Sequence, residues 1–252
     1  MSTFVKFFST LKNSRNIAES LLKHSCHFNT QASKFTINDM KALRVNFQSA
    51  SEDFVIPNEK IEDFPENYIC PKIIETCSLH IVTRYPPGIP KSRTNDLAAD
   101  LLRIAQLNCY PLHIEQNPQS KLYIFNEPYV LATYNFVDRS LRNINPKTRY
   151  GEIQIASEIL ACSDKNIRDN GEIYDQVLFA IRFISTYITF YKAEISEKYW
   201  KELSIGLPKK HSVVIKRWPG ENKKLSGLDL ASPEERIAVL NALTKIRQSL
   251  LK

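Results

Sequence analysis

Residues 135–162, NFVDRSLRNINPKTRYGEIQIASEILAC, contain the densest group of side chains whose types and spacing could do chemistry. The stretch begins like a strand, places Asp138 beside Arg139, and continues as a helix that carries Gln154 and Glu158. A Mg²⁺-dependent phosphodiesterase holds its ion with one or two carboxylates and uses a cationic side chain near the attacking water. The pattern therefore suggests nuclease chemistry, with these four residues as candidate catalytic groups.

Three acids are candidate metal ligands: Asp138, Glu158 and Glu127, which stands just before Pro128. Each acid on the helix or the turn also has an ordinary explanation. Gln154 and Glu158 lie four residues apart and share a helix face, and a solvated polar stripe that Glu152 extends would explain both. An acid at a hairpin turn, such as Glu127, is commonly just exposed. Mg²⁺ is expected as a cofactor only if this site is active, and no other cofactor is expected.

Basic residues follow the same stretch and return near the C-terminus. Four of them, Arg139, Arg142, Lys147 and Arg149, have no acid between them. A second group surrounds Trp218 with only Glu221 opposing it, and comprises Lys209, Lys210, Lys216, Arg217, Lys223 and Lys224. Such clusters bind phosphates without reading base sequence, and a tryptophan beside an arginine could stack on an unpaired base or pack in the core. The predicted nucleic-acid contacts are Arg142, Lys147, Arg149, Lys216, Arg217 and Trp218.

The composition supports a basic α/β protein with a substantial core. The chain has 252 residues, is 43% hydrophobic, and has 34 Lys and Arg against 27 Asp and Glu, which gives a net charge of +7. This charge favours nucleic acid as a non-specific partner over acidic solubilising roles. Five cysteines without a C-x-x-C pair indicate reduced intracellular thiols rather than a disulfide framework or a zinc cluster. The expected compartment is the nucleus or cytoplasm, and no membrane partner is expected, because Arg182 interrupts the longest apolar stretch.

Residues 1–68 are expected to form a separate helical or linker segment that is partly disordered. Residues 1–34 carry five basic side chains against one acid and recurring serines, a composition shared by mitochondrial transit peptides and by amphipathic surface helices. Residues 46–68 are acidic and punctuated by proline, which is typical of a linker or lid. The compact domain is then predicted over residues 69–252.

Within that domain the patterns predict a helix, three strands, two helices and a strand. Ser92 is placed as the N-cap of the first helix, and residues 110–116, 120–130 and 131–138 read as a three-stranded antiparallel meander. Residues 151–162 and 173–184 are predicted as helices, and residues 185–195 as a strand. A strand through KRWPG and a helix from Ser232, with Pro233 at its first position and Glu235 in a capping box, complete the chain.

This order of elements resembles the PD-(D/E)XK, or restriction-endonuclease-like, superfamily as found in fungal crinkler-type and related proteins. The sequence phrases that carry the resemblance are SRTNDLAADLLRIAQ, NEPYV, YGEIQIASEILAC, YITFYKAEI, GLPKKHSVVIKRWPG and ALTKIRQSLL. The resemblance covers roughly residues 70–251. It implies an α/β fold with a restriction-endonuclease-like core, here extended by the C-terminal strand and helix. It also implies an effector-like role.

The family's two acids and its lysine match Asn135, Val137 and Arg139 in this chain. Valine cannot ligate a hard cation, asparagine offers only a neutral oxygen, and arginine stays protonated. Asp138 could turn inward only if the strand slipped by one residue, which would exchange its two faces. The resemblance therefore implies a degenerate active site, in which a glutamine such as Gln154 would support the catalytic groups.

Three functions remain open from the sequence. The first is a catalytically impaired nuclease-fold protein that binds nucleic acid through basic faces. The second is an active Mg²⁺-dependent endonuclease that uses Asp138, Glu158 and another acid such as Glu127. The third is a protein-interaction module that binds acidic partners and no nucleic acid.

Overall fold

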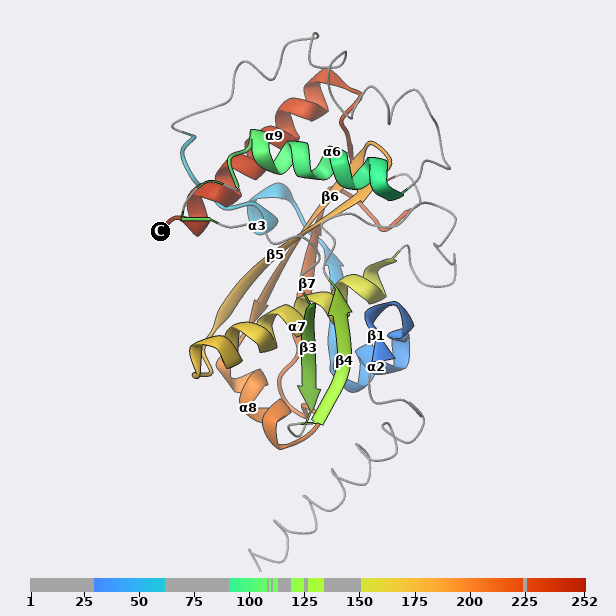
Figure 1. The fold of residues 1–252 in the computed structure, drawn as a ribbon, viewed down its shortest axis with the longest axis vertical. Helices are drawn as coiled ribbons and strands as arrows, with labels where there is room; N and C mark the ends of the chain where they lie inside the picture. The colour runs from blue at the N-terminus through green and yellow to red at the C-terminus, as the bar shows by residue number, and fades with distance from the viewer. Residues whose placement is uncertain are drawn as a thin grey trace, which may run out of the picture.

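Two β-sheets organise the chain, and one long helix lies between them (Figure 1). The structure is a computed structural model and describes residues 30–61, 91–107, 109, 111–112, 119–124, 127–133, 151–223 and 226–252. The predicted α/β class is confirmed, because these residues combine both sheets with helices that cover them.

The larger sheet has five strands. Its order is β2 (Val45–Ser49), β7 (Val213–Trp218), β6 (Tyr187–Ile195) and β5 (Gln176–Ile184), with β8 (Leu228–Asp229) also paired to β6. The strands β5 and β6 form a long antiparallel hairpin, whereas β2 and β7 run parallel. The parallel pair joins two segments that are far apart in sequence, so residues near position 45 depend on the C-terminal part of the chain for their hydrogen bonds.

The smaller sheet has the order β1 (Thr30–Gln31), β4 (Glu127–Thr133) and β3 (Gln119–Ile124). Helix α7 (Glu152–Asn170) contacts β3 and β4 on one side and β5 on the other. Its buried apolar residues belong to a core cluster shared with both sheets, and they include Ile153, Ala156, Ile159 and Leu160. A helix that is apolar on more than one face is typical of such an interior position.

A second core lies where three helices cover one end of the β5–β6 hairpin, at the top of Figure 1. These helices are α3 (Glu52–Val55), α6 (Lys91–Ile104) and α9 (Pro233–Leu250). Leu101 of α6 and Leu243 of α9 are buried in this core together with Phe190 of β6. The remaining helical elements are η1 (Ala32–Lys34), α2 (Ile37–Ala42) and α8 (Glu197–Ile205).

The two terminal helices of the predicted domain are confirmed, with differences at their caps. Helix α6 begins at Lys91, so Ser92 lies inside the helix and is not its N-cap. At α9, Pro233 is in the first turn and the Ser232 hydroxyl accepts a hydrogen bond from the Glu235 amide, as predicted. The Glu235 carboxylate accepts from the Asp229 amide, which ties the helix to β8 instead of closing a capping box.

The predictions for residues 110–138 and 173–184 are partly wrong. Residues 119–124 and 127–133 form two antiparallel strands, so the segment 120–130 that was predicted as a single strand contributes to both. The rest of the predicted meander falls largely outside the described residues. Residues 176–184 form β5 and not a helix, because a nearly continuous apolar run satisfies both patterns and pairing with β6 decides between them. The strands predicted at 185–195 and through KRWPG are confirmed as β6 and β7.

The predicted linker over residues 46–68 is wrong at its start. Residues 45–49 form β2, paired with β7, and residues 52–55 form α3, which packs in the second core. The acidic, proline-rich composition misled the prediction because a short edge strand needs few apolar residues. Residues 62–90, which include the predicted domain boundary at 68, lie outside the described residues, as do residues 1–29 of the leader-like segment 1–34. The last residues of that segment form β1 and η1.

Candidate functional site

Many of the predicted site residues fall in residues 134–150, outside the described residues. They are Asp138, Arg139, Arg142, Lys147 and Arg149, and their roles stay predictions. Glu127 begins β4, but its side chain is also outside the described residues. The predicted residues that the structure does describe are Gln154, Glu158, Lys216, Arg217 and Trp218.

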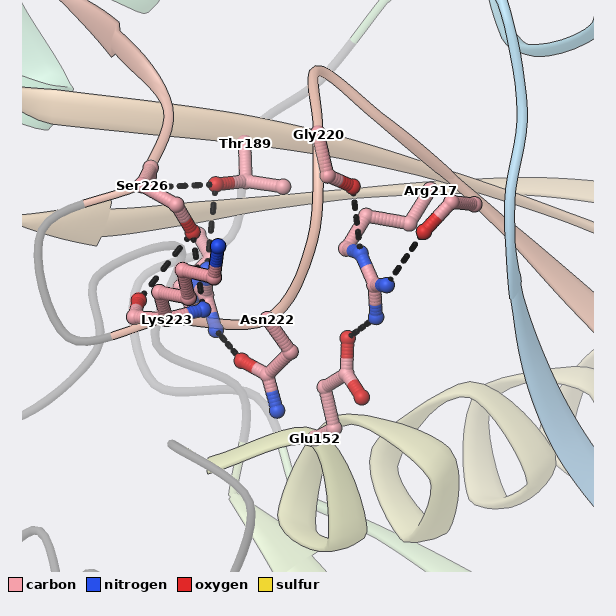
Figure 2. Close-up of polar contacts among 9 residues, drawn as sticks. Glu152, Thr189, Arg217, Gly220, Asn222, Lys223 and Ser226 are labelled. Carbon is pink, nitrogen blue, oxygen red and sulfur yellow. Dashed lines mark hydrogen bonds and ion pairs between the residues drawn. The ribbon is translucent and has the colours of Figure 1, made fainter.

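Arg217 is buried and holds three parts of the fold together, which contradicts its predicted role as a phosphate contact. Its guanidinium pairs with the Glu152 carboxylate and donates hydrogen bonds to Ser49 Oγ at 2.6 Å and to the Gly220 carbonyl at 3.0 Å (Figure 2). Only 7% of the Arg217 surface and 2% of the Glu152 surface are exposed. Arg217 is therefore unavailable to an external phosphate, because its charge and its donors serve the interior.

Lys216 and Trp218 also have structural partners. The Trp218 ring stacks on Phe190 with 5.8 Å between ring centroids and packs against the second core, as the core alternative predicted. The Lys216 ammonium lies 5.4 Å from the centroid of the exposed Phe54 ring. Trp218 therefore packs against the core on one side, and its predicted contact with an unpaired base stays a prediction.

The predicted pair on α7 forms, but its polar face is not a simple solvated stripe. Gln154 Nε2 donates a hydrogen bond to Glu158 Oε1 at 2.6 Å, and both side chains are partly buried. Glu152, expected to extend an exposed face, is instead buried against Arg217. Among the described residues, no three His, Cys, Asp or Glu side chains come together as a metal-binding group.

A second buried arginine fixes the loop between β7 and β8. Arg182 donates to Asn222 Oδ1 at 2.6 Å and to Thr189 Oγ1 at 3.1 Å, and the Thr189 hydroxyl donates to the Ser226 carbonyl (Figure 2). Arg182 is 1% exposed. Together with Arg217, it makes the described part of this loop a supported structural feature and not an open binding loop.

Other basic residues lie on two segments that hydrogen bonds join, the turn after α2 and the loop from α8 to β7. We call this group the basic end, and it consists of Lys41, Arg44, Lys209, Lys210 and His211. Arg44 joins its two halves, because Arg44 Nε donates to the His211 carbonyl at 3.1 Å. The sequences MKALR and GLPKKHS that carry these residues contain no acid.

Hydrogen bonds from α8 and from β7 fix the turn that carries Arg44. The Tyr199 hydroxyl on α8 donates to the Leu43 carbonyl at 3.0 Å, and the Val213 amide donates to the Arg44 carbonyl at 3.0 Å. Burial raises the pKa of Tyr199 far above its usual range, so the hydroxyl retains the proton that it donates. Arg44 itself has φ of 53°, a left-handed conformation that is uncommon outside glycine. A charged residue held in this conformation is a reason to look for function at this turn.

Helix α2, which precedes the turn at Arg44, is anchored to β4. Thr36 and Asp39 form a capping box, and the Tyr129 hydroxyl donates to the other oxygen of Asp39. Burial, together with this hydrogen bond and the Asp39 charge, raises the pKa of Tyr129 well above its usual range. The only acid near Lys41 on α2 is thus engaged in holding the helix.

Glu202 on α8 is the acid that faces the basic end, and backbone amides surround it. Its Oε2 accepts hydrogen bonds from the amides of Lys209, Lys210 and His211 at 2.9, 3.0 and 3.2 Å. Desolvation opposes its ionisation, but these three amides and the His211 side chain outweigh it and lower the pKa of Glu202 to about 2. The carboxylate thereby shapes the loop, and it leaves the side chains of Lys209 and Lys210 exposed.

The sequence patterns did not single out His211. Its Nδ1 lies 3.1 Å from Glu202 Oε1, although the two residues are nine positions apart and belong to a loop and a helix. Only the acid-free run of Lys209, Lys210 and His211 signals this site in the sequence, and Arg44 comes from the other end of the described chain.

Replacing Glu202 with glutamine is expected to destabilise the protein by about 1–2 kcal/mol at pH 7, because charge-assisted hydrogen bonds from three amides are weakened at a partly exposed site. The pKa of Glu202 is lowered on folding, so its contribution is present above the ordinary glutamate range and is lost as the pH falls from about 4.5 to about 2. Urea unfolding at pH 7 and pH 3 measures this difference.

Glu197→Gln on the same helix is the matched control, since Glu197 pairs with Lys201 at an exposed position. It is expected to cost about 0.5 kcal/mol or less at both pH values. Equal losses of unfolding free energy in the two variants would mean that the hydrogen bonds from the amides to Glu202 do not stabilise the protein.

In the comparisons with known proteins, no family model matches the chain, and no match is found among curated proteins or solved structures. No helix among the described residues is long and apolar enough to cross a membrane.

Proposed function

We propose that the chain binds nucleic acid, without reading its sequence, through the basic end. The observation that carries the proposal is the convergence of Arg44 with Lys209 and Lys210 at one exposed place, held by hydrogen bonds from α8 and β7. Arg44, Lys209 and Lys210 are exposed there, and the Glu202 carboxylate is engaged with the backbone amides of the loop. A fixed group of cations matches a phosphate backbone, which presents regularly spaced negative charge.

On α2 and α8, the large apolar side chains that are exposed in the described residues are Ile37 and Ile205, and neither is aromatic. Base stacking therefore has no described platform at the basic end, and phosphate contacts dominate the proposed binding. This favours similar affinity for single and double strands of equal charge and a strong dependence on salt.

The restriction-endonuclease-like core remains part of the proposal. The order α6, β3, β4, α7, β5 supports it in part, because it follows the implied order of helix, three-stranded meander, helix and strand with two strands of the meander described. The strands β3 and β4 belong to the smaller sheet and β5 to the larger one. The proposed core is catalytically impaired, in line with the matches at Asn135, Val137 and Arg139. Glu152, at the start of the helix after these positions, is paired with Arg217 and so is engaged by a protein cation.

The test is binding of a labelled 20-nucleotide strand and its duplex over a salt series. The triple variant Arg44→Gln, Lys209→Gln, Lys210→Gln is expected to bind about 20-fold more weakly at 0.1 M salt, with a salt slope reduced by about 2 to 3. The slope changes because binding releases fewer counterions from the nucleic acid when phosphate contacts are lost. Plasmid cleavage with Mg²⁺ or Mn²⁺ is recorded in parallel.

A matched triple, Lys165→Gln, Lys245→Gln, Lys252→Gln, removes the same charge from lysines that pair with acids elsewhere. It should bind within about twofold of the native chain. Equal loss in both triples would show that net charge and not the basic end determines binding. Cleavage that Asp138→Ala or Glu158→Ala abolishes would overturn the impaired core, and the absence of any binding would favour the protein-interaction module.

A further inference from the structure

Strand β5 forms one edge of the larger sheet (Figure 1). It pairs with β6 along all nine of its residues, and in the described part of the chain no strand pairs with its other side. Natural proteins commonly protect such an edge with a short strand, a bulge, a proline or a lysine. β5 has a continuous register and neither proline nor lysine, and its one charged side chain, Arg182, is buried. The strand therefore lacks the usual protection of a sheet edge.

The turn at the end of β5 determines which backbone groups face the open edge. Ile184 pairs with Tyr187 across a two-residue turn, and the residues that flank such a turn hydrogen bond to each other. Successive residues of an antiparallel ladder direct their N–H and C=O groups alternately toward and away from the partner strand. Val177, Phe179 and Ile181 therefore direct theirs away from β6, where these groups need water or another strand as a partner.

The open part of this edge is apolar and is centred on Phe179. Val177 is 53% exposed, whereas Phe183 is fully buried, so the accessible stretch is residues 177–181, with the sequence VLFAI. When two copies of this stretch pair antiparallel about Phe179, that residue lies opposite its own copy and Val177 lies opposite Ile181. Aromatic and β-branched residues are favourable partners across strands. The stretch is therefore complementary to itself, which favours a second copy of the chain over an unrelated strand.

The charged residues of β6 beside this stretch do not oppose the pairing. Lys192 lies opposite Phe179 in the hairpin, and Glu194 lies opposite Val177. The Lys192 ammonium is 2.8 Å from Glu194 Oε1, so the two charges offset each other within each copy. The hydrogen bond from Lys192 lowers the pKa of Glu194, which keeps this carboxylate ionised. Two copies can therefore approach without an uncompensated charge at the new contact.

We propose that two copies of the chain associate by pairing β5 antiparallel with β5 of the second copy, about a two-fold axis at Phe179. The two larger sheets then become one continuous sheet, and the outward backbone groups of residues 177–181 gain partners. Because the paired stretch is short, the interface is small, with a dissociation constant of about 10 µM. Arg44 precedes β2, at the opposite edge of the sheet, so the basic end stays accessible in the dimer. Association through β5 does not depend on nucleic-acid binding.

Analytical ultracentrifugation tests the dimer by measuring the mass of the native chain at about 1 µM and about 100 µM. The mass is expected to lie near 29.1 kDa at the lower concentration and to rise toward twice that value at the higher one. Val177→Lys, which places a charge on the apolar edge, is expected to weaken association at least about tenfold. Ile205→Lys is the matched control, because it adds the same charge at another exposed apolar position, and it should associate like the native chain.

Phe179→Cys tests the position of the axis without relying on a loss of association. Mild oxidation is expected to join two copies of this variant by a disulfide, because residue 179 faces itself across the axis. The native chain and Val177→Cys should cross-link much less. A native mass near 29.1 kDa at both concentrations would overturn the dimer, and association that Val177→Lys leaves unchanged would overturn the role of β5. Stronger cross-linking of Val177→Cys than of Phe179→Cys would overturn the axis at Phe179. Circular dichroism ensures that each variant is compared in its folded form.

Discussion

Glu152→Gln and Arg217→Met, made singly, are each expected to destabilise the protein by about 3–5 kcal/mol, because each leaves a buried group without its charged partner. Glu152→Gln leaves a guanidinium that is 7% exposed facing a neutral amide, and Arg217→Met leaves a carboxylate that is 2% exposed. Arg217→Met also removes the donors to Ser49 and Gly220, so it should be the more damaging change. Urea unfolding at pH 7 measures both.

The double variant Glu152→Leu, Arg217→Met tests the reason for this loss. Replacing both charges by apolar groups removes the unpaired charge, and the double variant is expected to be at least about 1–2 kcal/mol more stable than the worse single variant. Glu221→Gln is the matched control in the neighbouring loop, where Glu221 and Lys223 pair at 71% and 72% side-chain exposure. It should change stability by less than about 0.5 kcal/mol. A double variant no more stable than the worse single variant would mean that the unpaired charge is not the cause of the loss.

Gly227→Ala is expected to cost about 3 kcal/mol or more, since it combines a strained backbone with a clash that cannot relax. Gly227 has φ of +142°, and an added Cβ would lie 2.6 Å from the Ile188 carbonyl oxygen. That oxygen belongs to β6 opposite β8, so relief would require β8 to move away from the sheet. A thermal unfolding midpoint lowered by roughly 6–12 °C corresponds to this loss for a chain of this size.

Gly171→Ala separates the two causes of that loss. Gly171 ends α7 with φ of +75°, and nothing lies within 4 Å of an added Cβ. It therefore carries the conformational cost alone, about 1 kcal/mol. If Gly227→Ala were no worse than Gly171→Ala, β8 would not be held against β6 at this position in solution.

The elements that the sequence predicted well are those whose signals are local. Helix α9 has a serine cap, a proline in its first turn and a regular apolar stripe, and each of these acts within a few residues. The helix at α7 follows from the same periodicity, although its extension to Asn170 and its burial between two sheets do not. The strand at β6 follows from its β-branched and aromatic residues.

The failures share a physical cause, which is that they depend on partners far away in sequence. Strand β2 is stable because β7 pairs with it, and Ser49 and Arg217 are 168 positions apart. An apolar run such as β5 reads equally well as a helix until β6 is known to lie beside it. Arg217 was expected at the surface because basic and aromatic residues together are typical of nucleic-acid binding, and only its pairing with Glu152 shows that it faces inward.

The candidate site was predicted in part. Lys209 and Lys210 belong to the basic group found in the sequence, but Arg44, Glu202 and His211 do not. The hydrogen bonds that assemble them join a turn, a helix and a loop, and no spacing along the chain encodes that arrangement. The roles predicted for Asp138, Arg139, Arg142, Lys147 and Arg149 stay predictions.

The parallel pairing of β2 with β7 has a consequence for how the protein forms. A contact that closes a loop of more than 160 residues carries a large entropic cost before it gains any hydrogen bonds, so it belongs to the slow, late part of folding. The basic end depends on this same closure, because Arg44 leads into β2 and His211 leads into β7. During synthesis, residues 41–44 therefore have no β7 partner segment until residues 209–217 have left the ribosome. A chain stopped earlier contains Lys41 and Arg44 but lacks Lys209 and Lys210, so the basic end cannot form.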